Sequence, residues 1–255
     1  DFVMNFYQVR VAAGGVGGIA VDLLHKKEHV AKEMVTYFLR HYRERGAPIV
    51  MLYPFRPDFY KKMGFGYGTK INQYRVKPTA LPKGASRAHV RYLNKSNDDR
   101  QAVLDCYNRF LDRTHGLIEK SAYEIKRLLE NPKHRILGYE KDGRIMGYLV
   151  FGFDKGENVL LNDIHVREFV YESQEALSEL LTFLHVQADQ IRHIIFDTQD
   201  EYFHHLLLDP RNDSTRLVPS VYHESNIQGV GIMYRVIDVP GILGLLKERN
   251  FGGQT

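Results

Sequence analysis

The stretch that decides the fold runs from Asp58 to Tyr67 and reads DFYKKMGFGY. Two upstream segments belong with it: residues 14–21, GGVGGIAV, and residues 25–32, HKKEHVAK. Together they predict a glycine-flanked strand, a basic turn, an amphipathic helix and a short helix that carries aromatic residues. The order of these elements, more than any single motif, determines the expected fold.

The helix after the basic turn is expected to begin near Glu28 and to end before Gly46-Ala47-Pro48. One face is apolar, so the helix should bury it against a sheet. Its apolar residues at helical spacing are Val30, Ala31, Met34, Val35, Phe38, Leu39 and Tyr42. Downstream we expect a buried strand over residues 49–53, a short helix from Pro57 to Met63, and a strand over residues 67–76.

Upstream, two strands are expected over residues 4–11 and 16–21, joined by a turn at residues 12–15. The glycines at 14, 15, 17 and 18 invite a dinucleotide-binding interpretation, but that fingerprint needs a helix directly after the glycines. A strand is expected there instead. Close packing of the backbone is therefore the favoured explanation for these glycines.

The same order of elements recurs later in the chain. Strands are expected over residues 135–139, 145–153, 159–166 and 193–197, helices over 172–190 and 201–207, and a last strand over 229–236. On this alignment Ile164-His165-Val166 corresponds to Ile19-Ala20-Val21, and Phe203-His204 corresponds to Phe59-Tyr60. The chain therefore has two copies of one plan.

The second copy also has two expected helices, over residues 98–111 and 121–131, that the first copy lacks. The chain is accordingly expected to begin inside its first domain. We expect a first domain over residues 1–80 and a second over residues 87–255, with a link where Pro78, Pro82 and Gly84 interrupt the pattern.

Composition excludes several classes of protein. Hydrophobic residues make up 44% of the 255-residue chain, which suffices for packed cores rather than disorder. No apolar run reaches the length of a membrane span, and the first residues lack the basic start of a secretory signal, so we expect a soluble cytoplasmic protein. The single Cys106 can form neither an internal disulfide nor a cysteine-cluster metal site. The net charge of +4 is dispersed, which disfavours nucleic acid as a partner.

Read in order, the elements from Gly14 to Tyr67 resemble the acyl-CoA-binding core of the GNAT N-acyltransferases. The resemblance implies an α/β (α+β) fold of tandem GNAT domains, each a mixed, mostly antiparallel sheet flanked by helices. In this family a strand splays from its neighbour and bonds the pantetheine arm of acetyl-CoA, and a turn at a helix start holds the pyrophosphate. The resemblance implies these acetyl-CoA-binding residues: Ile19, Ala20, Val21, Lys26, Lys27, Glu28, His29, Val30, Ala31, Lys32 and Phe55.

The family turn has the pattern Arg/Gln-x-x-Gly-x-Gly/Ala, which places Lys26 at its first position, His29 at the first glycine and Ala31 at the second. His29 and Glu28 depart from the family, because they add a side chain and a negative charge beside an anionic ligand. The alternative is an ordinary helix start with a solvated basic turn.

Tyr60 is the candidate catalytic residue. It lies in Phe59-Tyr60-Lys61-Lys62-Met63-Gly64-Phe65, which resembles the family segment whose tyrosine protonates the departing CoA thiolate. The alternative role for Tyr60 is aromatic packing under the sheet. Backbone N–H groups near Ile19–Val21 would polarise the acyl carbonyl.

The tandem arrangement and the closing residues 233–239, MYRVIDV, resemble the Eis (enhanced intracellular survival) group. That resemblance implies acetylation of a primary amine by direct attack, with aminoglycoside-like or other polyamine substrates as examples, and a homo-oligomer without metal. Members of the group continue into a third domain whose C-terminal carboxylate is the catalytic base. This chain is thus expected to be truncated at both ends, and Thr255 is not assigned that role.

The second copy is expected to be non-catalytic. Its turn at residues 167–173 has no glycine and more acidic than basic residues, and His204 stands at the tyrosine position. Two functions remain: an acetyl-CoA-dependent N-acetyltransferase, or a degenerate GNAT protein that binds a ligand or partner without catalysis. Nucleic-acid binding ranks third.

Overall fold

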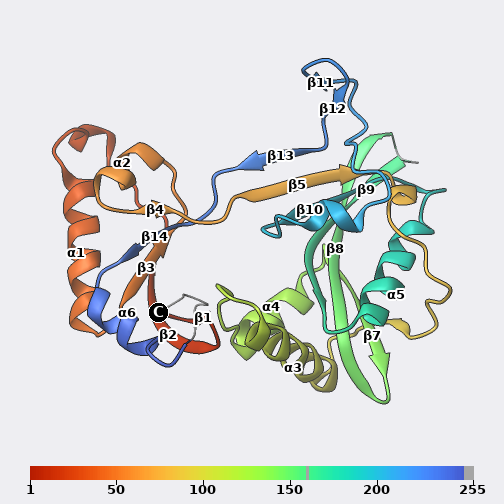
Figure 1. The fold of residues 1–255 in the computed structure, drawn as a ribbon, viewed down its shortest axis with the longest axis horizontal. Coiled ribbons are helices and arrows are strands. Elements are labelled where there is room, and N and C mark those ends of the chain that lie inside the picture. Colours follow the sequence, from red (N-terminus) through yellow and green to blue (C-terminus); the bar gives the residue numbers. More distant parts are fainter. Residues whose placement is uncertain (159–160, 250–255) are drawn as a thin grey trace, which may run out of the picture. The chain divides into compact units, whose positions relative to one another are not determined.

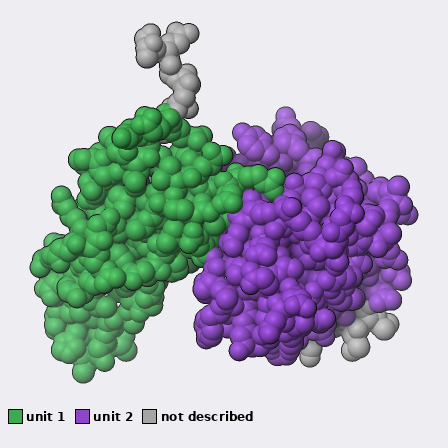
Figure 2. Space-filling view, turned by 90° about the horizontal axis from the view of Figure 1, so that it is seen from below, with its two compact units in different colours: residues 1–70, 111–119, 230–255 green, residues 71–110, 120–229 purple. Residues whose placement is uncertain are grey.

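The computed structural model describes residues 1–158 and 161–249. It divides into two compact units (Figure 2). Unit 1 comprises residues 1–70, 111–119 and 230–255, and unit 2 comprises residues 71–110 and 120–229. Each unit has a mixed sheet flanked by helices (Figure 1), so the expected α/β class is confirmed.

Unit 1 contains a five-stranded sheet in the order β1-β2-β3-β14-β4. Only β2 and β3 among these neighbours run parallel. The elements are β1 (Phe2–Phe6), β2 (Val9–Val16), the 3₁₀ turn η1 (Leu23–His25), α1 (Val30–Glu44), β3 (Ile49–Leu52), α2 (Pro57–Lys62), β4 (Gly66–Tyr67), β14 (Met233–Val236) and α6 (Val239–Leu245).

The sheet of unit 1 buries side chains on both faces, because successive residues of a strand point to opposite sides. In β3, Val50 and Leu52 pack with α1 and α2, whereas Ile49 and Met51 pack on the face that includes α6. The first face buries Val35, Phe38, Val50, Leu52, Tyr60, Phe65 and Met233. The second buries Met4, Val11, Ala13, Ile49, Met51 and Ile242.

The first hairpin differs from the expectation. Its turn is at Tyr7-Gln8, not at residues 12–15, and both turn residues have positive φ, 52° and 70°. Those angles are the ones a two-residue hairpin turn with right-handed strand twist requires. Gly14 and Gly15 lie inside β2, where a Cβ would overlap the rings of Tyr42 and Phe2 respectively. The interpretation of these two glycines as sites of close packing is confirmed.

Residues 111–119 cover the outer edge of β1. The backbone of Asn5 donates to Leu117 O at 2.8 Å and accepts from Gly116 N at 2.7 Å. The buried Asn5 amide also donates to Leu111 O and Thr114 O, at 2.5 and 3.0 Å. This segment therefore satisfies the hydrogen bonds of an edge strand that would otherwise be open.

Unit 2 contains a seven-stranded sheet in the order β13-β5-β10-β9-β8-β7-β6, in which only β9 and β10 pair in parallel. Its strands are β5 (Ile71–Val76), β6 (Val90–Tyr92), β7 (Arg135–Lys141), β8 (Arg144–Asn158), β9 (Leu161–Tyr171), β10 (Ile191–Thr198) and β13 (Asn226–Gly229). A separate hairpin is formed by β11 (Leu217–Val218) and β12 (Tyr222–His223). The helices are η2 (Pro78–Ala80), α3 (Asn97–Arg113), whose last residues belong to unit 1, α4 (Ala122–Glu130), α5 (Gln174–His185) and η3 (Phe203–Leu206).

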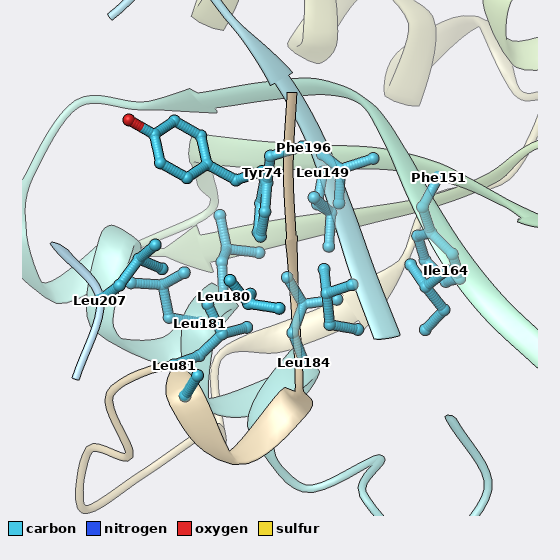
Figure 3. Close-up of a cluster of buried hydrophobic side chains, with 14 of the residues drawn as sticks. Tyr74, Leu81, Leu149, Phe151, Ile164, Leu180, Leu181, Leu184, Phe196 and Leu207 are labelled. Carbon is cyan, nitrogen blue, oxygen red and sulfur yellow. The ribbon is translucent and has the colours of Figure 1, made fainter. Parts of the chain in front are cut away.

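The main core of unit 2 lies between α5 and the sheet. Figure 3 shows Leu180, Leu181 and Leu184 of α5 packed with side chains of the strands, among them Leu149 and Phe196. Leu81, after η2, closes the same cluster. The apolar stripe read from the sequence of this helix is thus its buried face.

Two segments that the sequence predicts as single strands are each divided between the two sheets. The strand expected over residues 67–76 is two strands: β4 pairs in the sheet of unit 1, and β5 pairs with β10 in unit 2. The strand expected over residues 229–236 is likewise divided, because β13 belongs to unit 2 and β14 to unit 1. The sheets thus do not divide the chain at residues 80–87, and the domain limits at those residues stay a prediction.

Glycines allow the two segments that connect these strands to approach each other closely. A Cβ on Gly231 would overlap the backbone oxygen of Thr69, and a Cβ on Gly68 would meet Ile232 O at 2.7 Å. These segments link β4 to β5 and β13 to β14. The two links therefore lie side by side with no room for side chains between them.

Candidate functional site

The pairing of the parallel strands β2 and β3 ends at the last residue of each strand. Their pairing runs from Ala13 opposite Ile49 to Val16 opposite Leu52 and stops there. Beyond that point the backbone of residues 17–22 has no strand or helix assignment. The polar backbone groups of this segment are thus outside the ladder and accessible to a ligand that binds as an added strand would.

The expected strand over residues 16–21 is therefore wrong beyond Val16, and the expected splaying of that strand from its neighbour stays a prediction. Gly17 and Gly18 follow the last pair, and Gly18 has φ +67°, which ends the extended conformation. Ile19 packs against the α1 and α2 face of the core. Val21 is half-buried and Ala20 is exposed.

The start of α1 is an open helix N-terminus. Its N-cap residue is His29, which makes no side-chain capping hydrogen bond and has φ 63°. A left-handed residue at this position explains why glycine would suit it, since a non-glycine residue there costs roughly 1–2 kcal/mol. The next residues, Val30, Ala31 and Lys32, present the first N–H groups of the helix, where anions are favoured.

The charges around this turn are solvated. Lys26, Lys27 and Lys32 are exposed, and the Glu28 carboxylate lies 2.9 Å from His25 Nδ1. Lys27 also has a positive φ, 71°. The acidic residue that departs from the family turn is thus in contact with a neighbour within the turn.

Tyr60 lies on α2 and is buried, with 5% of its surface exposed. Its ring packs edge-to-face with Phe59 and Phe65, at centroid distances of 5.1 and 6.0 Å, in the same cluster that receives Ile19. Burial raises the pKa of the Tyr60 phenol, so it keeps its proton at neutral pH. The structure thus brings Tyr60 and Ile19 together, whereas Phe55 projects from the loop before α2 and is 82% exposed.

A largely apolar cavity of about 490 Å³ adjoins the end of β2. It is lined by Val16, Ile19, Glu33, Met34, Tyr37, Phe38 and His41. Sequence reasoning placed Met34 on the buried face, but it is 43% exposed here. Tyr37 and His41 were missed. They lie four residues apart, each one position before Phe38 and Tyr42, and this spacing was the available signal for an aromatic stripe on the helix.

In unit 2 the corresponding strands extend past their last parallel pair. The last parallel pair is Val166 opposite Phe196, so Val166 corresponds to Val16, not to Val21 as the sequence alignment had it. The expected turn at residues 167–173 is wrong, because residues up to Tyr171 continue β9. The Ser173 side chain then caps α5 by accepting from Ala176 N. His204 is exposed on η3.

No group of three or more His, Cys, Asp or Glu side chains within residues 1–158 and 161–249 is arranged to hold a metal ion. No helix there has both the length and the apolar character needed to span a bilayer.

Family comparison matches both copies. Two models, each described as an acetyltransferase (GNAT) domain, match residues 1–68 and 110–236, which together exceed half of the chain. No curated protein sequence matches significantly.

Solved structures share the fold at low sequence identity. A GCN5-related N-acetyltransferase from Anabaena variabilis superposes with a TM-score of 0.78 at 16% identity, covering 95% of this chain and 59% of its own. A probable N-acyltransferase from Enterococcus faecalis gives 0.77 at 16% identity, with coverages of 95% and 58%. Eis1 from Mycobacterium abscessus gives 0.73 at 18% identity, with coverages of 96% and 61%. The chain thus spans about three fifths of the length of these proteins.

Proposed function

Because this chain belongs to the GNAT acetyltransferase family, we propose that it is an acetyl-CoA-dependent N-acetyltransferase of the Eis-like group. Unit 1 binds the acyl donor, and a primary amine is the acceptor. The observation that carries the proposal is the end of the β2–β3 pairing at Val16 and Leu52, together with the uncapped N-terminus of α1, which follows after residues 17–29.

The donor would be held by main-chain groups and by the turn. The free backbone of residues 17–21 can pair with the amide groups of a pantetheine arm, and the N–H groups at the start of α1 can bind a pyrophosphate. Lys26, Lys27 and Lys32 add positive charge around this helix end. Glu28 is exposed, so solvent screens the repulsion between its carboxylate and the pyrophosphate.

Tyr60 supplies the proton. The amine nitrogen attacks the acyl carbon, the carbon–sulfur bond breaks, and the phenol donates its proton to the departing thiolate. The raised pKa of Tyr60 keeps that proton available at neutral pH, and proton transfer from a positioned acid is worth about 10²–10⁴-fold in rate. The base that deprotonates the amine is not assigned.

Calorimetric titration with acetyl-CoA tests donor binding directly. We expect one site in the chain, weakened at least tenfold by Ala31→Asp, which puts a carboxylate in the first turn of α1 beside a phosphate. Ala188→Asp, on an exposed position after α5, is the matched control and should bind as the parent does. Equal binding by the parent and Ala31→Asp would contradict a site at this helix end.

One observation favours a second candidate, a binding module without catalysis. His29 occupies the left-handed position that glycine suits, so a side chain stands where a backbone must approach the ligand. Thiol release from acetyl-CoA, measured against a panel of primary amines and polyamines, separates the two functions. Release above the no-amine background supports the enzyme; donor binding with no release for any amine supports the module.

A further inference from the structure

Unit 2 has a polar cavity that the proposed acetyl transfer does not use. It has a volume of about 330 Å³, within the range of sites for small ligands. The cavity lies where β5 and β10 meet the segment 212–216, which precedes the β11–β12 hairpin. Its polar lining includes Gln73, Arg75, Arg192, Asn212, Ser214 and Arg216.

Three guanidinium groups from separate elements line this one cavity. Arg75 comes from β5, Arg192 from β10, and Arg216 from the segment before β11. Guanidinium groups present forked donors that match the oxygens of phosphate, often with two hydrogen bonds from one side chain. The amides of Gln73 and Asn212 donate to Asp197 and Glu224, at 2.9 and 2.5 Å, and each amide has a second N–H. With the Ser214 hydroxyl they add neutral groups to the lining.

The carboxylates of the cavity wall are already engaged by other groups. Asp213 accepts from Lys77 Nζ at 2.8 Å and lies 3.3 Å from His193 Nε2. The Lys77 ammonium holds the pKa of Asp213 below its usual value, so this carboxylate stays ionised and paired. Glu224 accepts from the Asn212 amide at 2.5 Å and is 3.9 Å from Arg216.

The arginines are less completely engaged than the acids. Arg75 is paired with Asp163 at 3.2 Å, and the 3.9 Å approach to Glu224 is too long for a hydrogen bond from Arg216. Arg192 forms no salt bridge with any described carboxylate. The cavity thus retains unneutralised guanidinium charge.

The segment that forms the wall is held in place. Asp213 has φ 61°, a conformation that disfavours non-glycine residues, and its contacts with Lys77 and His193 tie it to the sheet. His193 itself is 1% exposed and also contacts Asp163, at 3.0 Å. Strain of this kind persists only where the surroundings fix it, so the cavity is preorganised.

We propose that this cavity binds a phosphate group, either as free phosphate or as part of a small phosphorylated ligand. Arg192 and Arg216 are its principal donors, with Arg75 shared between the ligand and Asp163. The site is separate from the acyl-donor site because every lining residue belongs to unit 2.

Titration of the chain with inorganic phosphate, by calorimetry at constant ionic strength, tests this proposal. We expect one site, weakened at least tenfold by Arg192→Gln and by Arg216→Gln. Both arginines are exposed, so the variants should unfold at the parent's temperature. Arg87→Gln removes an exposed arginine of unit 2 that is not in the cavity lining and should bind phosphate as the parent does.

A further variant separates this site from the proposed donor site. Lys26→Gln lies in unit 1 and should leave phosphate binding unchanged, whatever its effect on acetyl-CoA. The proposal is overturned if the parent binds no phosphate at millimolar concentration. It is also overturned if Arg192→Gln binds like the parent, or if Arg87→Gln or Lys26→Gln loses as much affinity as Arg192→Gln.

Discussion

Helices α1 and α5 hold the same place in their units, but their N-termini differ. Thirteen positions, residues 17–29, separate β2 from α1, whereas Glu172 and Ser173 alone separate β9 from α5. The N-terminus of α5 is capped by its own Ser173, and that of α1 by no side chain. A helix end that satisfies its own N–H groups has little capacity left for an anion.

The strands beside these helices differ in the same sense. After Val166 and Phe196 the strands β9 and β10 continue, each paired on its other side, to β8 and β5. Phe169 and Phe203 pack against Phe196 there, at centroid distances of 6.0 and 4.9 Å. After Val16 in unit 1 the chain leaves the sheet instead. The comparison teaches that two copies of one fold differ at this point: in unit 2 the strands extend and a short loop leads to a capped helix, whereas in unit 1 the strands end and a long loop leads to an uncapped helix.

The largest expected effect is on the rate of acetyl transfer, and it compares Tyr60 of unit 1 with His204 of unit 2. Tyr60→Phe should lower the rate of acetyl transfer by about 10²–10⁴-fold, because the phenol proton is lost, and leave acetyl-CoA affinity unchanged. His204→Phe, at the position that the sequence alignment makes equivalent, should leave both unchanged. The measurements are steady-state thiol release and calorimetry. Equal losses in the two variants would remove Tyr60 from the mechanism.

A smaller effect is expected at Gly14, which pairs opposite Val50 as Ile164 pairs opposite Ile194 in unit 2. Gly14→Ala should lower the free energy of unfolding by roughly 1–3 kcal/mol, because the new methyl group overlaps the Tyr42 ring and displaces α1. Gly17→Ala is the control, since nothing lies within 4 Å of its Cβ position. Urea unfolding measures both, and equal values would show that α1 adapts without cost.

Removing the cap of α5 should have a moderate effect confined to stability. Ser173→Ala deletes the side-chain acceptor for Ala176 N and should cost about 1 kcal/mol in the free energy of unfolding. Acetyl-CoA should bind with unchanged affinity, because unit 2 contributes no donor site. A change in that affinity without a change in fold would assign the second copy a part in donor binding.

The smallest expected effect on stability is at His29, the N-cap residue of α1 in unit 1. His29→Gly removes a non-glycine residue from the left-handed region, a gain of roughly 1–2 kcal/mol, which is partly offset by about 0.5–1 kcal/mol for the greater freedom of glycine when unfolded. The net gain in stability should be about 0–1.5 kcal/mol. Acetyl-CoA affinity should rise severalfold because the backbone can approach the pyrophosphate. Weaker binding would show that the His29 ring donates to the ligand.

Patterns with a clear period were read correctly from the sequence. Helix α1 was expected from near Glu28 and spans Val30–Glu44, and the strand and short helix after it lie within one residue of their expected limits at each end. These elements have strong apolar periodicity or a proline start. The first hairpin turn was missed because Tyr7-Gln8 is not a pair that favours positive φ.

The candidate site could be predicted in part. The order of strand, turn and helix placed Lys26 to Lys32 at a helix start, and the aromatic motif placed Tyr60 on the next helix. The cavity beside Met34, Tyr37 and His41 could not be predicted, because exposure on a helix depends on what covers it. The cavity of unit 2 that we propose to bind phosphate could not be predicted from the sequence either, since its arginines are far apart in the chain.

The sequence by itself determined that this protein has two copies of one α/β plan and which segments form most of their helices and strands, because the spacing of apolar residues records local periodicity. It also indicated the donor turn and Tyr60. Only the tertiary structure decided that β5 and β14 pair in the sheets they do and that the N-terminus of α1 is uncapped where that of α5 is capped. Strand alternation is the same whichever sheet a strand joins, so the choice rests on long-range pairing and packing.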